Sequence, residues 1–377
     1  MTDVDVAIVG GGIIGLAFAT VASRNGKTVE LFERSARPEG ASVRNFGMIW
    51  PIGQRPGPDY DRAMRSRAIW IEMARETGIW LNPCGSLHLA HADDEMSVIE
   101  EFAGSGQVNC RVLSAREVKD RCSAVNPKGL RGGLWSPTEC AVNPRTAIAR
   151  LGDWLNQSGR VKVNWRTAIT RVEPGLVVTA TGREIRANHA IVCSGSDFET
   201  LLPEVFAKSD IRRCKLQMLK TAAQPQGWQL GPHLAAGLTL THYKSFDHCP
   251  TLPALKARFA NERPDCVRFG IHVMASQQET GEVTIGDSHE YDNAISLFDR
   301  VEIDDLILDY LDTFVTLPDR RIDARWHGIY AKHPTRLFVA ESVDPHLHIA
   351  VAPGGAGMTL SFGLAEEWFQ QRGELVN

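Results

Sequence analysis

The stretch that constrains the fold most is the one nearest the N-terminus. Residues 4–9 are apolar and predict a short buried strand, and the glycine-rich loop Gly10–Gly15 follows directly. An apolar run over residues 16–25 then predicts a helix, and a second predicted strand over residues 28–32 leads into Glu33. Strand, loop, helix, strand and acid in this order predict a βαβ unit that binds an adenine dinucleotide, whereas the glycine motif alone would be weak evidence.

Each glycine of this loop has its own physical role. Gly10 allows the tight turn out of the strand, Gly12 lets the backbone approach a pyrophosphate, and Gly15 lets the helix pack close to the strand. The N–H groups at the helix N-terminus then face the phosphates, with the helix dipole behind them. Glu33 is placed to accept hydrogen bonds from ribose hydroxyls and would repel a 2′-phosphate, which argues against NADP. The alternative is a glycine-rich turn with a purely structural use.

Length and composition limit the classes to which this chain can belong. A chain of 377 residues is longer than one core comfortably fills, so we expect two domains. Its 43% hydrophobic and 23% charged residues are ordinary for a globular protein. The net charge of −4 gives no electrostatic case for binding nucleic acid or an anionic membrane. No stretch approaches about 20 uninterrupted apolar residues, so no membrane span is expected.

The cysteines and histidines show no local pattern of a metal site. Eight cysteines are scattered and none forms a CxxC pair, which favours reduced thiols in the cytoplasm over a disulfide framework or a zinc site. The N-terminal apolar stretch also lacks the basic region of a signal peptide. His346 and His348 share a strand face, but no third ligand has a suitable spacing, so we expect no metal.

Three further segments have the composition of ligand-binding loops. Residues 41–51 combine small residues, a charged pair and a glycine, so this segment can wrap a ligand. Residues 190–195 predict a buried strand that ends on a serine and a glycine, where backbone passes close to a ligand. A second glycine loop, residues 354–359, opens the last predicted helix, residues 360–371. In the middle of the chain, the alternating pattern predicts strands over residues 238–243, 266–274 and 281–286.

A second glycine loop before a C-terminal helix is not expected of an NAD dehydrogenase. Together with the N-terminal unit, it makes the chain resemble the D-amino-acid-oxidase family of FAD enzymes, which includes glycine oxidase and monomeric sarcosine oxidase. The resemblance covers most of the chain and is strongest at both ends. It implies an α/β protein in which a Rossmann-like FAD-binding domain is joined to an α+β substrate domain with an antiparallel sheet. We expect the FAD-binding domain to comprise residues 1–80, 143–215 and 320–377, and the substrate domain residues 81–142 and 216–319.

The resemblance also implies which residues hold FAD. The N-terminal unit would bind the ADP half, the segment after it would lie along the pyrophosphate and the ring, and the C-terminal glycine loop would hold the flavin pyrimidine. A helix N-terminus aimed at that ring stabilises the anion formed on reduction. The covalent-flavin cysteine of sarcosine oxidase has no evident counterpart, so we expect noncovalent FAD. The implied residues are Gly10, Gly12, Ile13, Ile14, Gly15, Glu33, Arg34, Ser42, Arg44, Asn45, Gly47, Met48, Val172, Ser194, Gly195, Gly354, Gly355, Gly357, Met358 and Thr359.

Two departures from the family pattern concern the substrate and the electron acceptor. Glycine and D-amino-acid oxidases place an arginine for the substrate carboxylate where this chain has Tyr330, and Lys332 follows two residues later. Residues two apart on a strand share a face, so both could reach the ligand. Sarcosine oxidase places a lysine near flavin N5 where a loose alignment puts Thr284 here. The acceptor is therefore O2 or another compound.

Details of residues 44–51, 286–289 and 326–330 resemble a bacterial branch of the family linked to aminophosphonate breakdown. A phosphonate dianion is bulkier than a carboxylate and has three acceptor oxygens, so several dispersed donors suit it better than one planar arginine. The residues expected at the substrate are Trp50, Arg55, Tyr243, His289, His327, Tyr330 and Lys332.

Together, these expectations predict the reaction that the protein catalyses. A small anionic amine related to 2-aminoethylphosphonate, with N-methylated or hydroxylated forms included, would pass hydride to the flavin and become an imine that hydrolyses to an aldehyde. His289 would take the ammonium proton. The alternatives are a glycine- or sarcosine-type amino-acid oxidase, an FAD-dependent hydroxy-acid dehydrogenase, and a flavin-bound assembly protein without turnover. A homodimer is compatible with the sequence and is not required by it.

Overall fold

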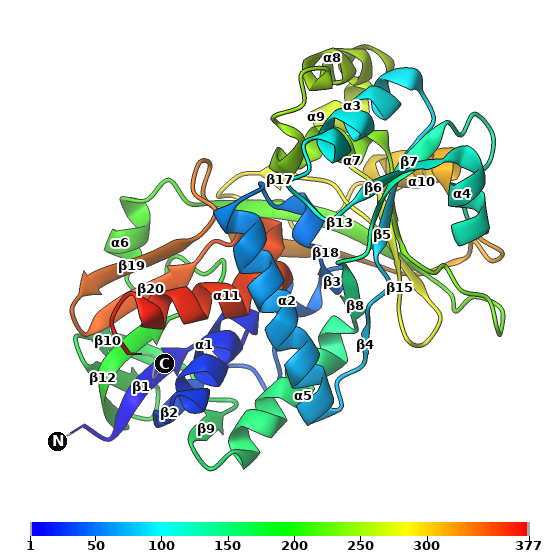
Figure 1. Cartoon of the computed structure of the whole chain (residues 1–377). Coiled ribbons are helices and arrows are strands. Elements are labelled where there is room, and N and C mark those ends of the chain that lie inside the picture. Colours follow the sequence, from blue (N-terminus) through cyan, green and yellow to red (C-terminus); the bar gives the residue numbers. More distant parts are fainter. Residues whose placement is uncertain (1, 375–377) are drawn as a thin grey trace.

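The computed structural model describes residues 2–374, which form two lobes joined at a narrow waist (Figure 1). One lobe contains an eight-stranded sheet and the other a nine-stranded sheet. A small three-stranded sheet lies where the lobes meet and consists of β3 (Met48–Ile49), β4 (Leu81–Asn82) and β8 (Cys140–Val142). Among the described residues, no helix combines the length and apolarity that crossing a membrane requires.

The eight-stranded sheet is built around the N-terminal strand. β1 pairs in parallel with β2 on one side and β12 on the other, and β9 and β20 continue the parallel order outward. β10, β11 and β19 add antiparallel edges. The strands are β1 (Val4–Val9), β2 (Val29–Phe32), β9 (Val161–Asn164), β10 (Ile169–Glu173), β11 (Leu176–Thr179), β12 (Glu184–Val192), β19 (Val339–Asp344) and β20 (Leu347–Val351).

Both faces of this sheet are covered, which explains why its strands are apolar throughout. Val6 and Ile8 of β1 pack into the core shared with four helices, while Ala7 and Val9 face a second core on the opposite side. The helices of the first core are α1 (Ile13–Arg24), α2 (Pro58–Thr77), α5 (Pro144–Gln157) and α11 (Gly357–Gln370). The second core includes Phe206 of the short helix α6 (Pro203–Ala207).

The nine-stranded sheet is antiparallel except for the pairing of β14 with β5. Its strands are β5 (Ser86–Ala90), β6 (Arg111–Ser114), β7 (Gly132–Ser136), β13 (Arg212–Thr221), β14 (His233–Ala235), β15 (Met274–Gln277), β16 (Val283–Gly286), β17 (Glu290–Tyr291) and β18 (Ile322–Lys332). The helices of this lobe are α3 (Asp93–Gly104), α4 (Ala115–Arg121), α7 (Gly237–His242), α8 (Leu252–Glu262), α9 (Pro264–Arg268) and α10 (Val301–Phe314). The 3-10 turns of the chain are η1 (Ala41–Val43), η2 (Pro51–Gly53), η3 (Lys244–Phe246) and η4 (Gly354–Ala356).

Strand β18 joins the two lobes. It pairs with β13 along nearly its whole length, so it belongs to the nine-stranded sheet although the expected FAD-binding segment 320–377 included it. Its last residue, Lys332, forms an isolated bridge with Pro353, next to the C-terminal glycine loop. The division into two domains at the expected boundaries stays a prediction.

Two strands predicted in the middle of the chain were wrong. Residues 238–243 are mostly the helix α7, and the predicted strand 266–274 contains the end of α9 and only the first residue of β15. α7 is short and its first four residues are buried, so its apolar pattern does not distinguish a helix from a strand. Pro264 occupies the first turn of α9, a position where proline starts helices readily.

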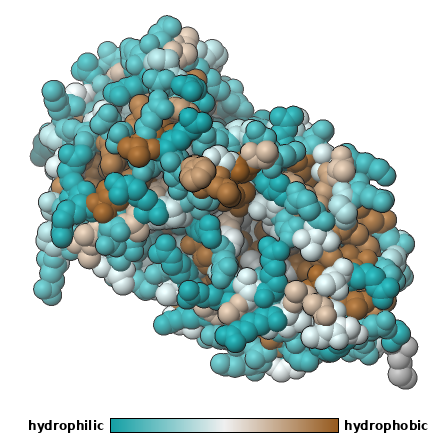
Figure 2. All heavy atoms as spheres, turned by 180° about the vertical axis from the view of Figure 1, so that it is seen from behind, coloured by the Kyte–Doolittle hydropathy of each residue, from teal (hydrophilic) through white to brown (hydrophobic). Residues whose placement is uncertain are grey.

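The view from behind shows a mostly hydrophilic surface (Figure 2). Hydrophobic residues gather in a few places on this face, among them the hollow between the two lobes. Val9 and Phe32, the last residues of β1 and β2, line a cavity, and ligands of α/β sheets bind at the carboxyl ends of their strands.

The N-terminal loop is packed too tightly to tolerate side chains. Gly10 has a φ of +112°, and a Cβ added there would lie 2.3 Å from the carbonyl oxygen of Cys193. A Cβ on Gly15 would lie 2.0 Å from the carbonyl oxygen of Gly10. The first turn of α1 therefore rests directly on the backbone of the loop.

The substitution Gly15→Ala should destabilise the fold, because the colliding atom is a backbone oxygen that cannot move aside. We expect the free energy of unfolding to fall by about 3 kcal/mol in urea unfolding. The matched control is Gly104→Ala, where a Cβ would meet nothing within 4 Å, and there we expect a change of less than about 0.5 kcal/mol. Equal stability of the two variants would contradict the close contact.

Candidate active site

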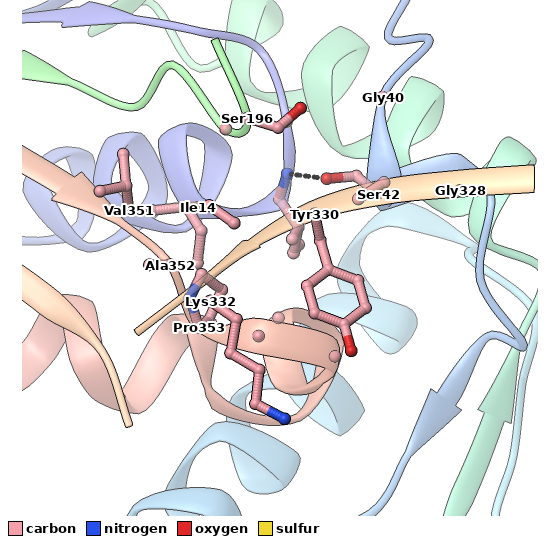
Figure 3. A pocket seen from close by; sticks show the side chains of 18 of the residues that line it. Ile14, Gly40, Ser42, Ser196, Gly328, Tyr330, Lys332, Val351, Ala352 and Pro353 are labelled. Atoms are coloured by element: carbon pink, nitrogen blue, oxygen red, sulfur yellow. Dashed lines mark hydrogen bonds between the residues drawn. The ribbon is translucent and has the colours of Figure 1, made fainter. Parts of the chain in front are cut away.

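A single elongated cavity of about 1090 Å³ runs between the lobes. Its walls come from the loop after β1, from η1 and η2, from β13, β15 and β18, and from the loop before α11. Figure 3 shows its middle part, where β18 passes over the C-terminal glycine loop and the N-terminal βαβ unit lies beside them. We divide the cavity into three parts. The dinucleotide end is lined by residues of the loop Gly10–Gly15, Glu33 and Ser42, and the middle part by the loop before α11 and the end of β18. The far wall is formed by His242, His272 and His289.

The dinucleotide end is preorganised by backbone hydrogen bonds. Glu33 accepts hydrogen bonds from the N–H groups of Gly11 (2.8 Å) and Ser35 (2.9 Å), which fixes its carboxylate at the end of β2. Ser42 Oγ accepts from Ile13 N at 2.9 Å (Figure 3). A Cβ on Gly12 would come within 3.0 Å of that hydroxyl, so the glycine keeps the approach to the start of α1 open.

This end fits an extended adenine dinucleotide. Gly12 caps α1 without a side chain, so the helix N-terminus presents backbone N–H groups and the positive end of its dipole to the cavity. The Glu33 carboxylate lines this end and can accept hydrogen bonds from hydroxyl groups, and Arg34 beside it pairs with Asp197 at 2.7 Å. The groups available to a pyrophosphate at this end are backbone N–H groups, as in other dinucleotide-binding loops.

The middle part ties the two ends of the chain together. Thr359 Oγ1 accepts a hydrogen bond from Trp50 N at 2.9 Å, and the carbonyl of Met358 accepts one from Trp70 Nε1 at 2.7 Å. α11 begins here with no acidic residue in its first turn, so its positive dipole end faces the cavity without compensation. Gly354, with a φ of +57°, turns the chain into this helix.

Tyr330 and Lys332 lie above that loop. Their side chains leave β18 on the same side and point in the same direction (Figure 3). Tyr330 lies against Gly355, and Lys332 Nζ donates a hydrogen bond to Tyr291 Oη at 2.9 Å. Burial lowers the pKa of Lys332 below its ordinary value and raises the pKa of Tyr330. The pair therefore offers a cation and a hydroxyl donor to an anionic group.

The far wall contains a group of imidazoles. His242 ends α7, His272 precedes β15, and His289 follows β16, with Asp287 between the last two in space. The rings of His242 and His272 stack with centroids 3.8 Å apart, and His272 Nε2 lies 3.1 Å from Asp287 Oδ1. Burial lowers the pKa of His289 to about 3 and also lowers the pKa values of His242 and His272. All three rings are therefore uncharged at neutral pH.

The remaining walls are apolar or aromatic. Trp50 and Tyr243 lie with ring centroids 6.2 Å apart, and a Cβ on Gly53 would collide with both rings. Tyr243 Oη contacts Met274 Sδ at 3.8 Å. Leu216 and Met218 of β13, with Met274 of β15, complete a surface that excludes water from a reacting centre.

Most of the residues expected at the cofactor line this cavity. They are Gly10, Gly12, Ile13, Ile14, Gly15, Glu33, Arg34, Ser42, Arg44, Asn45, Met48, Ser194, Gly195, Gly354, Gly355, Gly357, Met358 and Thr359. The expected substrate residues that line it are Trp50, Arg55, Tyr243, His289, Tyr330 and Lys332. Arg55 does so at the margin, where its guanidinium lies 3.4 Å from the exposed carboxylate of Asp247.

Three expected residues lie outside the cavity lining. Gly47 faces the backbone of Val142, where a Cβ would lie 1.9 Å from the carbonyl oxygen. Val172 is in β10 and pairs with β11, away from the cavity. His327 points to the other side of β18 from Tyr330, and its Nδ1 lies 2.8 Å from Asp299 Oδ1.

The sequence did not point to four polar residues of the far wall and its margin, namely His242, Lys244, His272 and Asp287. Asp287 had a usable signal, because it stands two residues before His289 at a strand end. His242 directly precedes Tyr243, but its segment was expected to be a strand. His272 had no local signal at all, since only the folding of three distant segments brings it to the cavity.

Comparison with known proteins supports the same fold. A family model described as FAD dependent oxidoreductase matches residues 5–370. A subunit of the opine oxidase of Rhizobium meliloti is 24% identical over 257 residues, which cover 63% of this chain and 68% of that protein. The bifunctional protein ThiO/ThiG of Nostoc sp. is 27% identical over 214 residues, and glycine oxidase of Geobacillus kaustophilus is 26% identical over 206. These matches cover 53% and 51% of this chain, but only 32% of ThiO/ThiG and 54% of glycine oxidase.

Solved structures extend the likeness over the full length. Glycine oxidase from Bacillus cereus superposes with a TM-score of 0.77 at 17% identity, covering 100% of this chain and 96% of that one. L-α-glycerophosphate oxidase from Mycoplasma pneumoniae, solved with FAD bound, gives a TM-score of 0.73 at 18% identity, covering 97% and 93%. The predicted fold class is thus confirmed. Because the family match spans nearly the whole chain, this protein belongs to the family of FAD-dependent oxidoreductases.

Proposed function

We propose that this protein oxidises a small anionic amine, and that an aminophosphonate related to 2-aminoethylphosphonate is the substrate. N-methylated and hydroxylated relatives of that compound are included. The product is an imine, which water converts to an aldehyde. When bound, FAD supplies the hydride acceptor, and the protein supplies position, charge and exclusion of water.

The cofactor residues follow from the cavity. We assign the ADP half to the N-terminal loop and Glu33, the pyrophosphate to the backbone around Gly12 and Ser42, and the ring to the loop before α11. Thr359 and Met358 hold this loop against Trp50 and Trp70, so the ring end is stiff on the side where a hydride acceptor would lie. No cysteine attachment is part of the proposal, because burial raises the pKa of the lining Cys193 thiol and keeps it protonated.

The observation that carries the substrate proposal is the pair Tyr330 and Lys332 beside the C-terminal glycine loop. Lysine binds phosphate-type anions as a point charge, and a neighbouring phenol adds a hydroxyl donor, so this pair can serve a tetrahedral dianion in place of an arginine. Tyr291 holds the ammonium of Lys332, and Lys244 brings a second cation to the cavity margin. Leu216, Met218 and Met274 leave the other side apolar, as a short carbon chain requires.

Two expectations drawn from the sequence are modified in this proposal. A proton-acceptor role for His289 is not retained, because an imidazole with a pKa of about 3 is a weak base toward an ammonium group. Thr284 is buried in β16 and is not among the cavity-lining residues, so it contributes nothing to the choice between O2 and another acceptor.

The direct test is anaerobic reduction of the bound flavin by a panel of compounds. We expect bleaching near 450 nm (about the absorption maximum of an oxidised flavin) with 2-aminoethylphosphonate or its N-methyl or hydroxy relatives, faster than with glycine or sarcosine. Faster bleaching by glycine or sarcosine would favour an amino-acid oxidase, the activity named for the Geobacillus kaustophilus relative. Bleaching by hydroxy acids alone would replace the amine proposal.

Removing the charge of Lys332 should weaken substrate binding without affecting the cofactor. For Lys332→Met we expect KM for the best aminophosphonate to rise about 10- to 100-fold, because a charged hydrogen bond contributes about 1.5–3 kcal/mol. The FAD content, measured from the ratio of flavin to protein absorbance, should stay that of the wild type. The control is Lys208→Met on the exposed surface, which should leave KM unchanged. An unchanged KM in Lys332→Met would remove this lysine from the site.

The lowered pKa of Lys332 gives the binding of anions a pH dependence. As the pH rises, the buried ammonium loses its proton before an ordinary lysine would, at a pH below about 10.4. The affinity for methylphosphonate, which carries no amine of its own, should therefore fall with rising pH in this alkaline range. Perturbation of the flavin spectrum during titration measures that affinity. Lys332→Met should bind methylphosphonate more weakly and lack the alkaline fall; an identical fall in the variant would assign it to another group.

A further inference from the structure

Three histidines far apart in the sequence meet at the far wall of the cavity. One ring nitrogen from each of His242, His272 and His289 lies within 4.8 Å of the corresponding nitrogens of the other two. The ring centroid of His242 lies 3.8 Å from that of His272 and 4.4 Å from that of His289. Three different segments contribute one imidazole each, so the cluster is a product of the tertiary fold.

One ring nitrogen is hydrogen-bonded in His289 and lies close to a carboxylate in His272. His289 Nδ1 lies 3.0 Å from the carbonyl oxygen of Gly270, and because a carbonyl only accepts, Nδ1 carries the proton and Nε2 has a free lone pair. His272 Nε2 lies 3.1 Å from Asp287 Oδ1 without the geometry of a hydrogen bond, and its Nδ1 is buried and has no hydrogen-bond partner within residues 2–374. A histidine that binds a metal typically uses its other ring nitrogen for a carboxylate or a backbone carbonyl.

The burial of the cluster leads to the same site. His272 and His289 are buried and His242 is partly buried, and the neutral imidazole is the form that coordinates metal ions. An unpaired buried ring nitrogen costs free energy unless it finds a partner. The cations whose charges act on the cluster are Lys332 and Lys256, and its other neighbours are Tyr243, Tyr291, Tyr330 and Asp287.

We propose that His242, His272 and His289 bind one divalent transition-metal ion of the Zn²⁺ type and leave one coordination position open toward the cavity. Three neutral imidazoles and an exchangeable fourth position are the donor set of open zinc sites. Ligand nitrogens at 2.0–2.1 Å from zinc lie about 3.4 Å apart in a tetrahedron, so nitrogens that lie within 4.8 Å of one another need to close by up to about 1.4 Å. The open position takes an oxygen of the substrate's anionic group, and this second part rests on the proposed function.

Metal binding can be measured without any substrate. The FAD-loaded protein is freed of metal by dialysis against a chelator and titrated with ZnCl₂ in a calorimeter. We expect one equivalent of Zn²⁺ to bind with a dissociation constant in the micromolar range or below. Co²⁺ in place of Zn²⁺ should produce absorption bands at wavelengths longer than those of the flavin. Absence of stoichiometric binding would overturn the proposal.

Single variants locate the site. His272→Gln and His289→Gln should each weaken Zn²⁺ binding at least 100-fold, whereas His346→Gln on the exposed surface should not. Flavin content and the thermal unfolding midpoint establish that each variant is folded. If one variant fails to fold, the other still tests the site. Zn²⁺ binding that is equally strong in both cluster variants and the wild type would place the metal elsewhere.

The substrate part has its own readout. Methylphosphonate is titrated into the metal-free and the Zn²⁺-loaded protein while the flavin spectrum is followed. At least tenfold tighter binding to the loaded protein is expected, and equal affinity would overturn the role of the open position while leaving the metal site in place. Because neither titration depends on turnover, failure of the amine-oxidation proposal is recognised separately, in the flavin-bleaching panel.

Discussion

The architecture depends on one close contact of backbone with backbone. The first turn of α1 rests on the carbonyl of Gly10, and Gly10 in turn rests on that of Cys193, so the carboxyl ends of β1 and β12 and the start of α1 are fixed as one unit. No side chain could replace these contacts without moving a strand. The N-terminal glycine loop is therefore held rigidly by the sheet from which it emerges.

Strand β18 connects the nine-stranded sheet with the loop that opens α11. It is anchored to β13 in the nine-stranded sheet and ends at Pro353, beside the loop before α11. The nine-stranded sheet thus positions Tyr330 and Lys332, and their side chains lie beside the C-terminal glycine loop. In the proposed assignment, the cofactor is held mainly by backbone and the substrate by side chains, so one fold can bind the same cofactor and accept different substrates.

The features that could be predicted from the sequence are those formed by residues close to one another in the chain. The βαβ unit, both glycine loops and the facing of Tyr330 with Lys332 are local in the chain, and the structure places them together at the cavity. The segment around His242 was misread because a short, largely buried segment fits a helix and a strand equally well. His272 lies beside Asp287 because β15 and β16 pair as an antiparallel hairpin, and no pattern in the sequence around His272 marks it as a cavity residue.

The hydrogen bonds that join Thr359 to Trp50 and Met358 to Trp70 connect residues that are 309 and 288 positions apart in the sequence. During synthesis, the N-terminal glycine loop is therefore translated well before the loop that opens α11. Under the proposed cofactor assignment, a growing chain presents the residues for the ADP half before it can hold the flavin ring. Stable capture of FAD then follows translation of α11, which makes cofactor uptake a late step.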